Sequence, residues 1–181
     1  TRVSLYIGIF AAFIVTGVGT VLALVSGYFG GVTDKIITAI TNIAMAVPSL
    51  PLTVLLVAYL NPGKWSLIIA ISVTAWTGTA RILRSRVMQL KELPFIKIEK
   101  TMGVHPVVIL FKHILPNIKD IILTRGAMAI SGAMMTEAGL SFLGLGEFGE
   151  KSWGSVLHYA FFRNSIMKKQ YWWYVPPIVC I

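Results

Sequence analysis

An uncharged apolar run at the start of the chain restricts the fold more than any other feature of the sequence. No charged residue lies between Arg2 and Asp34, so residues 3–31 exceed the length of about 20 apolar residues that a transmembrane helix needs. A second uncharged run covers residues 36–62. Because backbone polar groups inside a bilayer must be paired within the protein, runs of this length predict membrane helices. We therefore expect an all-α polytopic membrane protein.

Composition and motifs argue against an enzyme. Hydrophobic residues make up 56% of the chain and charged residues 13%, against about 25% charged residues in a typical soluble domain. Cys180 is the only cysteine, and the three histidines have no metal-ligand spacing. Residues 144–149 match the pattern GxGxxG, but they follow a predicted membrane helix and not a strand, so we interpret them as a flexible exit from that helix. We expect no catalytic activity, no bound cofactor and no metal.

The apolar runs set the order of the membrane segments. We predict helices near residues 3–29, 36–60, 65–90 and 118–143, the start of a further helix at 171–181, and an external loop at 147–169. The second helix contains Pro48 and Pro51. Neighbouring helices can satisfy the carbonyl groups that a proline frees, so we predict one kinked helix, with two short helices separated by a break as the alternative.

The basic stretch at residues 91–117 interrupts the apolar pattern. Pro94, Gly103 and Pro106 divide it, because proline suits the first turn of a helix and glycine suits its C-terminal end. We therefore predict two short helices, near 95–102 and 106–115, with the second ending at Pro116. The apolar residues of the second follow a helical spacing that predicts one oily face: Val107, Leu110, Phe111, Ile114 and Leu115. A compact helical unit of this kind is typical of a docking element.

The positive charges predict the orientation of the chain. Nine of the sixteen Lys and Arg residues lie between Arg81 and Arg125. Positively charged loops stay on the cytoplasmic side of a membrane, so residues 91–117 are predicted to be cytoplasmic and the 147–169 region external. The net charge of +9 is also compatible with nucleic-acid binding. Because the charges alternate with apolar helix faces and flank membrane ends, topology explains them better, and we expect no nucleic-acid partner.

Glu137 is the one acidic residue at membrane depth, because it alone interrupts the apolar run at residues 126–146. Acidic residues at membrane depth usually face a protein interior or a wet cavity. One interpretation is a contact in a translocation pathway or gate, and the other, which we favour, is a buried polar anchor hydrogen-bonded to a neighbouring helix. Ser131 lies in the same helix among alanines, and small residues of this kind permit close helix packing, within the subunit or against a partner.

Several motifs in order carry a resemblance to a known family. They are SGYFGG at residues 26–31, AVPSLPL at 46–52, TAWTGTARILRS at 74–85, Gly103 with ILPN at 114–117, EAGLSFLGLG at 137–146 and Ser152-Trp153-Gly154. With these motifs the chain resembles, over nearly its whole length, the permease subunits of binding-protein-dependent ABC importers for dipeptides and oligopeptides. The resemblance implies a type I ABC importer transmembrane domain in a multi-pass cell-membrane protein. It also implies a helix before Thr1 and a sixth completed after Ile181, so about five of six helices are present and we expect the chain to be truncated at both ends.

The resemblance also implies partners and a site. The partners are ATP-binding subunits, which would bind the ATP, a second permease subunit, an extracytoplasmic substrate-binding protein and the lipid bilayer. The family's cytoplasmic coupling element corresponds to residues 91–117, and coupling to the ATPases would run through residues 95–115. The residues implied in this coupling are Lys97, Ile98, Glu99, Met102, Gly103, Val104, His105 and Pro106.

This chain departs from the family pattern at the start of the coupling element. The pattern has Glu-Ala-Ala where this sequence has Lys97-Ile98-Glu99. Exchanging an acid for a base can invert a salt bridge across an interface, so a co-adapted ATPase and a weakened or regulatory permease are the two explanations. The expected substrate is a dipeptide or oligopeptide. The alternatives are a nickel or sugar permease of the same kind, or an ion-gradient-driven secondary transporter, for which paired intramembrane ionisable residues or an inverted repeat would be expected.

Overall fold

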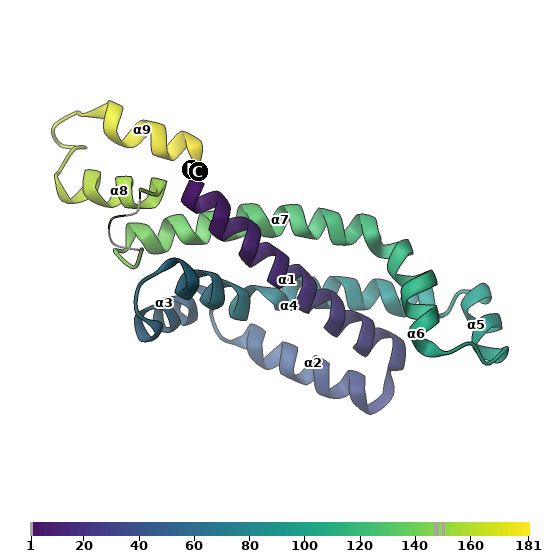
Figure 1. Ribbon diagram of the computed structural model, residues 1–181. Coiled ribbons are helices and arrows are strands. Elements are labelled where there is room, and N and C mark those ends of the chain that lie inside the picture. The colour runs from purple at the N-terminus through teal and green to yellow at the C-terminus, as the bar shows by residue number, and fades with distance from the viewer. Residues whose placement is uncertain (1, 147–148, 150) are drawn as a thin grey trace. The chain divides into compact units, whose positions relative to one another are not determined.

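The computed structural model describes residues 2–146, 149 and 151–181, and these are folded into helices joined by short turns (Figure 1). The helices are α1 (Arg2–Phe29), α2 (Gly31–Ala46), α3 (Ser49–Leu60), α4 (Lys64–Lys91), α5 (Pro94–Thr101), α6 (Pro106–Ile109), the π-turn η1 (Leu110–Ile114), α7 (Leu115–Phe142), α8 (Trp153–Phe162) and α9 (Tyr171–Cys180). The expected all-α fold is confirmed over these residues. Parts of the predicted external loop at 147–169 and of the glycine pattern at 144–149 lie outside them, while α8 occupies the middle of the loop region.

Two helices meet the requirements of a membrane span by themselves. Among the described residues, α1 and α4 are each 28 residues long and apolar enough to cross a bilayer. The helices α2 and α3 meet the same requirement only together, and they are bent by 85° at the break between them. The spans predicted at 118–143 and from residue 171 stay predictions.

The prediction of one kinked helix over residues 36–60 was wrong, and its alternative, two helices with a break, is what the chain forms. Val47 is extended, with φ −83° and ψ 127°, as the residue before a proline prefers. Pro48 then precedes α3 as its N-cap, so the helix cannot continue through it. Pro51 leaves α3 intact because it is the third residue of that helix, where the backbone N–H has no intrahelical partner to lose.

Contacts divide the chain into two units, and each takes parts of α1, α4 and α7. The second unit contains residues Ile14–Val47 and Ala75–Ala127. Its core is formed by buried side chains of six elements: Ala23, Leu24, Tyr28, Leu83, Val87, Leu90, Ile96, Ile109, Leu110, Ile114 and Ile118. Gly27 lets α1 approach α4 closely, since a Cβ there would lie 2.8 Å from the Cβ of Val87. The core of this unit therefore includes the short helices of the basic element.

An ion pair joins α2 to α4 in the second unit. Arg84 donates from Nε to Asp34 Oδ1 at 2.5 Å and from its terminal nitrogen to Oδ2 at 2.6 Å, which is the bidentate geometry of the strongest charged hydrogen bonds. The side chains are 28% and 17% exposed, respectively. Arg81, on the same helix, donates a single exposed hydrogen bond of 2.8 Å to Asn42.

Replacing Arg84 with methionine is expected to destabilise the full-length protein by about 2 kcal/mol, because it leaves the half-buried Asp34 carboxylate without its partner. Thermal unfolding in detergent measures the loss. The matched control is Arg81→Met, which removes one exposed bond and is expected to change stability by less than about 0.5 kcal/mol. Equal losses of stability in the two variants would show that the bidentate ion pair contributes no more than the exposed hydrogen bond of Arg81.

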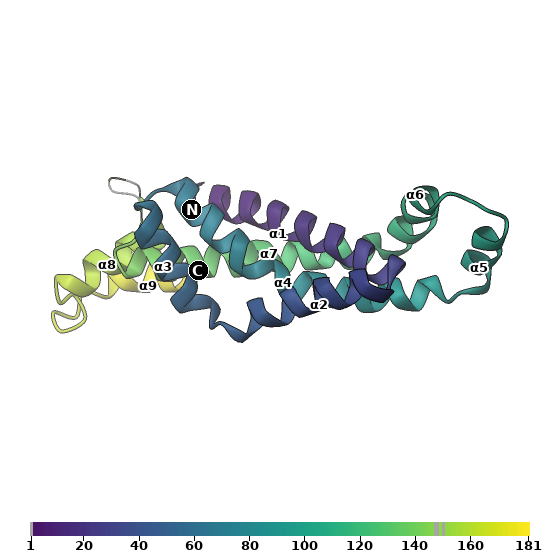
Figure 2. The same ribbon diagram turned by 90° about the horizontal axis from the view of Figure 1, so that it is seen from below.

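The first unit contains Thr1–Phe13, Pro48–Thr74 and Met128–Ile181. Its core gathers apolar side chains of α1, α3, α4 and α7: Ile7, Ala11, Val57, Leu67, Ile68, Ala70, Ile71, Ala133 and Leu140. The helix α8 begins with a capping box in which Ser152 and Ser155 each bond the other's backbone N–H. It packs against α7 at Gly154, where a Cβ would lie only 2.3 Å from the carbonyl oxygen of Ala138. The helices α8 and α9 lie side by side in both views (Figures 1 and 2).

Candidate functional site

The basic element at residues 91–117 forms a sharp corner between α5 and α6 (Figure 2). Pro94 is the first residue of α5, and the helix ends at Thr101. Gly103 then takes φ +77°, a left-handed conformation that side chains with a Cβ disfavour. His105 caps α6, and its Nδ1 accepts a hydrogen bond from the backbone N–H of Val107 at 3.4 Å. Glycine and the two helix starts at Pro94 and Pro106 therefore define the corner locally.

Buried side chains hold the corner to the rest of the second unit. Ile96 of α5 is 1% exposed, and Ile109 and Ile114 are fully buried. Half-buried Val104, at the corner itself, packs against the same core. Burying a large aliphatic side chain contributes about 1.5–3 kcal/mol relative to leaving it exposed. The corner is therefore an anchored part of the fold, and movement of the corner requires movement of the helices behind it.

A second contact braces α5 against the π-turn. His113 Nε2 lies 2.8 Å from Glu99 Oε1, with both side chains about three-quarters buried, and the ring of Phe95 is 6.4 Å from the ring of His113. The other oxygen of Glu99 is buried and has no hydrogen-bond partner among the described residues. The backbone N–H of Val104 donates to the carbonyl oxygen of Glu99 at 3.1 Å. Glu99 therefore faces inward and links α5 to the π-turn.

Replacing His113 with alanine is expected to loosen α5 more than replacing Glu99 with alanine does. The first change leaves a buried carboxylate oxygen pair without a partner, at a cost of about 1–2 kcal/mol. The second removes the whole carboxylate and is expected to cost less than about 0.5 kcal/mol, because an unpaired buried oxygen disappears with it. Amide hydrogen exchange over Pro94–Thr101 measures both. A larger loss of protection in Glu99→Ala would contradict this order.

The outer face of the element combines apolar and cationic side chains. Ile98 is 58% exposed and Met102 is 76% exposed. Lys97 pairs with Glu92 at 2.8 Å, but both side chains are more than half exposed, so this ion pair is weak. The hydrogen bond from Lys97 lowers the pKa of the Glu92 carboxyl. Exposed Lys100 forms no ion pair with any described residue. The face that remains for a partner is apolar and positively charged.

The predicted end of the second short helix at Pro116 was wrong. The helix continues from α6 through the π-turn η1 into α7, and Pro116 is the second residue of α7. A single π-turn is a common irregularity within α-helices at functional sites, and proline is tolerated in a first helical turn. The buried face is narrower than the predicted oily face: Leu110 and Ile114 are buried, whereas Val107 is 48% and Phe111 63% exposed.

The structure brings the predicted coupling residues together at one corner but gives them different surroundings. Lys97, Ile98, Met102, Gly103 and His105 are exposed, whereas Val104, Pro106 and Glu99 are half-buried. Sequence reasoning missed His113 and Phe95, which contact Glu99 or its partner. No spacing in the sequence indicates the His113–Glu99 pair, because it joins two helices on either side of the corner. The role of these residues in coupling stays a prediction.

Glu137 and Ser131 lie on different faces of α7 in the first unit. Glu137 is 1% exposed, and its Oε1 accepts a 2.7 Å hydrogen bond from Ser141 of the same helix. The predicted bond to a neighbouring helix was wrong, since residues four apart face each other along one helix. Its Oε2 has no partner among the described residues and lines a cavity of about 10 Å³. Ser131 is exposed. The burial of the Glu137 side chain favours a buried polar anchor over a contact in a translocation pathway. Both roles stay predictions.

Solved structures share this arrangement of helices. The chain is similar to two structures of the MetNI methionine ABC transporter in inward-facing conformations, at 18% identity in each. One match has a TM-score of 0.75 and covers 99% of this chain and 86% of that one. The other has a TM-score of 0.72 and covers 89% and 78%, respectively. The chain therefore has the fold of these transporter structures, which confirms the expected fold class.

Sequence comparison identifies the family. The family model described as "Binding-protein-dependent transport system inner membrane component" matches residues 19–179, and the chain belongs to this family of multi-pass plasma-membrane proteins. It is 40% identical over 156 residues to the oligopeptide transport system permease protein OppC of Bacillus subtilis (strain 168), covering 86% of this chain and 51% of that protein. It is 36% identical to the dipeptide transport system permease protein DppC of the same organism, covering 84% and 48%. The chain thus spans about half the length of the curated relatives that it matches.

Proposed function

We propose that this chain is the membrane-embedded permease subunit of an ATP-driven importer and that its α5–α6 corner docks into a cytoplasmic ATPase subunit. The observation that carries the proposal is a corner anchored by Ile96, Ile109 and Ile114 that exposes Ile98 and Met102. Exposed apolar side chains on an otherwise solvated element indicate an interaction surface. Methionine suits such a surface because its flexible side chain adapts to irregular pockets.

The continuous helix behind the corner provides a mechanical connection. From Pro106 to Phe142 the chain passes through α6, η1 and α7 without a break at Pro116. ATP-driven closure of two ATPase subunits would push the corner, and a helix packed into the core transmits displacement as a rigid element. Coupling would therefore run through residues 95–115 and along α7. ATP hydrolysis would take place in the partner subunits, and this chain would not itself be an enzyme.

The names of the relatives favour a peptide as the substrate. The matched proteins are described as oligopeptide, dipeptide and glutathione transport system permease proteins. We extend that substrate class to this chain, together with a second permease subunit that would complete the path and a substrate-binding protein on the external side. The exposed position of Ser131 on α7 is compatible with a contact to the second permease.

Crosslinking the corner to an ATPase subunit tests the proposal. The full-length protein carries Cys180→Ser, which removes an exposed free thiol, and Met102→Cys, which places a thiol at a position 76% exposed. Co-expression with candidate ATPase subunits that carry single cysteines is expected to give a crosslink that ATP binding changes. The control is Tyr59→Cys, at a position 87% exposed near the C-terminal end of α3. The positive charges place residues 91–117 in the cytoplasm, so alternation of the membrane segments predicts that this end of α3 is external. A Met102→Cys variant that crosslinks to no ATPase, or only as efficiently as the control, would exclude the docking role.

A further inference from the structure

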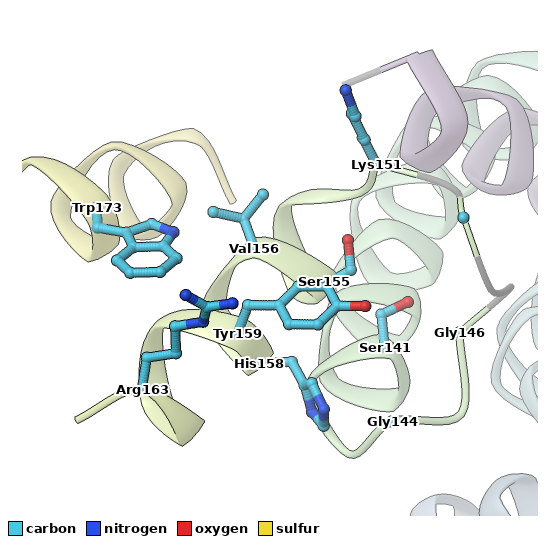
Figure 3. Close-up of a pocket in the computed structure, with 11 residues that line it drawn as sticks. Ser141, Gly144, Gly146, Lys151, Ser155, Val156, His158, Tyr159, Arg163 and Trp173 are labelled. Carbon is cyan, nitrogen blue, oxygen red and sulfur yellow. The ribbon is translucent and has the colours of Figure 1, made fainter. Parts of the chain in front are cut away.

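A pocket of about 600 Å³ lies among the end of α7, α8 and α9 in the first unit (Figure 3). Its walls come from Ser141 of α7, Ser155 and Tyr159 of α8, Arg163 just after α8, and Trp173 of α9. This volume falls within the range of about 300–1,000 Å³ of small-molecule sites. The pocket belongs to none of the residues assigned above to coupling or to helix packing.

The polar groups that remain available in the pocket are hydrogen-bond donors. Arg163 and Lys151 form no ion pair with any described residue, and the described side chains that line the pocket include no acid. In Figure 3 the guanidinium of Arg163 lies between Trp173 and Tyr159. The Tyr159 hydroxyl points toward the serine side of the pocket and has no hydrogen bond to a described residue.

The other polar groups of the pocket are already occupied. Ser141 donates its hydroxyl proton to Glu137 at 2.7 Å, and Ser155 donates its own to the backbone oxygen of Ser152 at 2.9 Å. His158 Nδ1 lies 2.7 Å from the backbone oxygen of Phe142. A ligand between Arg163 and Tyr159 would therefore meet a guanidinium and a phenol as donors, which together suit an anion. The indole of Trp173 and the ring of Tyr159 offer apolar surface for the body to which the anion is attached.

We infer that this pocket binds the free C-terminal carboxylate of a peptide, with Arg163 as the principal cation. A guanidinium matches a carboxylate in a planar, bidentate geometry, and the aromatic walls suit the adjoining peptide chain. The region 147–169 is predicted to be external from the charge pattern, so the pocket is placed where a peptide would arrive. The inference rests on the proposed function and adds a chemical requirement to it: the transported peptide carries an unblocked carboxyl end.

Comparing the affinities of a peptide acid and of its C-terminal amide distinguishes recognition of the carboxylate from non-specific attraction of peptides. The full-length permease is assembled with its partner permease and ATPases in nanodiscs without a binding protein. Radiolabelled trialanine and trialanine C-terminal amide are the two probes in equilibrium dialysis. We expect the acid to bind at least about tenfold more tightly than the amide, a difference of one decade in Kd. Equal affinity for the two peptides in the unsubstituted protein, or inorganic phosphate competing as well as trialanine, would overturn the inference.

Two variants locate the effect in the pocket. Arg163→Gln is expected to abolish the preference for the acid, and Tyr159→Phe, which keeps the ring, is expected to reduce it. The matched control is Lys168→Gln, a cation of the same turn that does not line the pocket and whose loss is expected to leave the preference unchanged. Equal effects of Arg163→Gln and Lys168→Gln would overturn the inference.

The same variants keep this inference distinct from the proposed function. Nucleotide-sensitive crosslinking at Met102→Cys is expected to persist in Arg163→Gln, because the substitution lies in the other unit. Equal affinity for the acid and the amide in the protein that keeps Arg163, with the crosslink at Met102→Cys intact, would overturn the pocket alone. If Met102→Cys gave no crosslink to an ATPase in the protein that keeps Arg163, the proposed function would be overturned instead.

Discussion

Replacing Gly154 with valine is expected to unfold the contact between α8 and α7 and to lower the stability of the full-length protein by about 3 kcal/mol or more. A Cβ at this position would lie 2.3 Å from the carbonyl oxygen of Ala138 and 2.8 Å from the Ala138 Cα. Both atoms belong to the backbone of α7, so no side-chain rotation relieves the overlap. Overpacking of this kind requires the two helices to separate. Thermal unfolding in detergent and limited proteolysis between residues 151 and 170 measure the effect.

Gly139→Ala is the matched control for Gly154→Val. Gly139 lies on α7 next to Ala138, and a Cβ there would meet nothing within 4 Å. Exchanging an exposed helical glycine for alanine raises stability by about 0.5–1 kcal/mol, because alanine loses less backbone freedom on folding. The substitution inside the contact and the one outside it should therefore act in opposite directions. A Gly154→Val protein as stable as the parent would show that α8 does not pack on α7 in this way.

The apolar pattern was sufficient to predict the long helices, because the bilayer leaves few alternatives to a helix for an uncharged run. The predicted helix near 3–29 corresponds to α1 (Arg2–Phe29), and the one near 65–90 to α4 (Lys64–Lys91). Composition could not distinguish the two prolines of the second run. Pro48 breaks the helix and Pro51 does not, and the difference depends on which residue becomes the first of α3. Helix register of that kind is decided by packing, which periodicity does not describe.

The two short helices and the turn between them could be predicted from the sequence, but the contacts inside the corner could not. Proline and glycine act locally, so Pro94, Gly103 and Pro106 predicted two short helices and the turn between them. The sequence did not indicate the π-turn, and Phe111, which a regular helical spacing assigns to the oily face, is 63% exposed. The contact of Glu99 with His113 likewise joins residues on either side of the corner.

The three residues that depart from the family pattern, Lys97, Ile98 and Glu99, lie in different surroundings. Glu99 stands where the family pattern has alanine, and it is turned inward against His113. The exposed positions are occupied by Lys97 and Ile98, so this face presents a cation and an aliphatic side chain. An ATPase groove complementary to it would carry an acid near Lys97 and an apolar recess for Ile98. Between the two explanations of the departure, these positions favour a co-adapted ATPase, because the fold of the corner is intact.

Replacing Gly103 with valine is expected to reduce ATP-driven uptake by at least about tenfold while leaving the amount of folded protein unchanged. Gly103 has φ +77°, and a Cβ there would meet nothing within 4 Å, so the cost lies in the backbone of the corner and not in a clash with the core. A left-handed conformation costs an ordinary residue about 1–2 kcal/mol, and more for a β-branched one. The corner is expected to relieve this strain by rotating the end of α5, which moves Met102 relative to His105. A displacement of that kind at a docking surface is sufficient to lose most of the coupling.

Gly103→Asn separates backbone strain from the loss of a small residue at the docking surface. Asparagine accepts the left-handed conformation more readily than other residues with a Cβ, yet it is larger than alanine. If the conformation of the corner determines coupling, Gly103→Asn should retain most of the uptake that Gly103→Val loses, in proteoliposomes that contain the complete transporter. If instead the ATPase groove tolerates only glycine at this point, both variants will lose uptake equally and Met102→Cys will crosslink poorly in both. Uptake at the parental rate in Gly103→Val would show that the corner does not carry the coupling, because its strained backbone would then have no functional consequence.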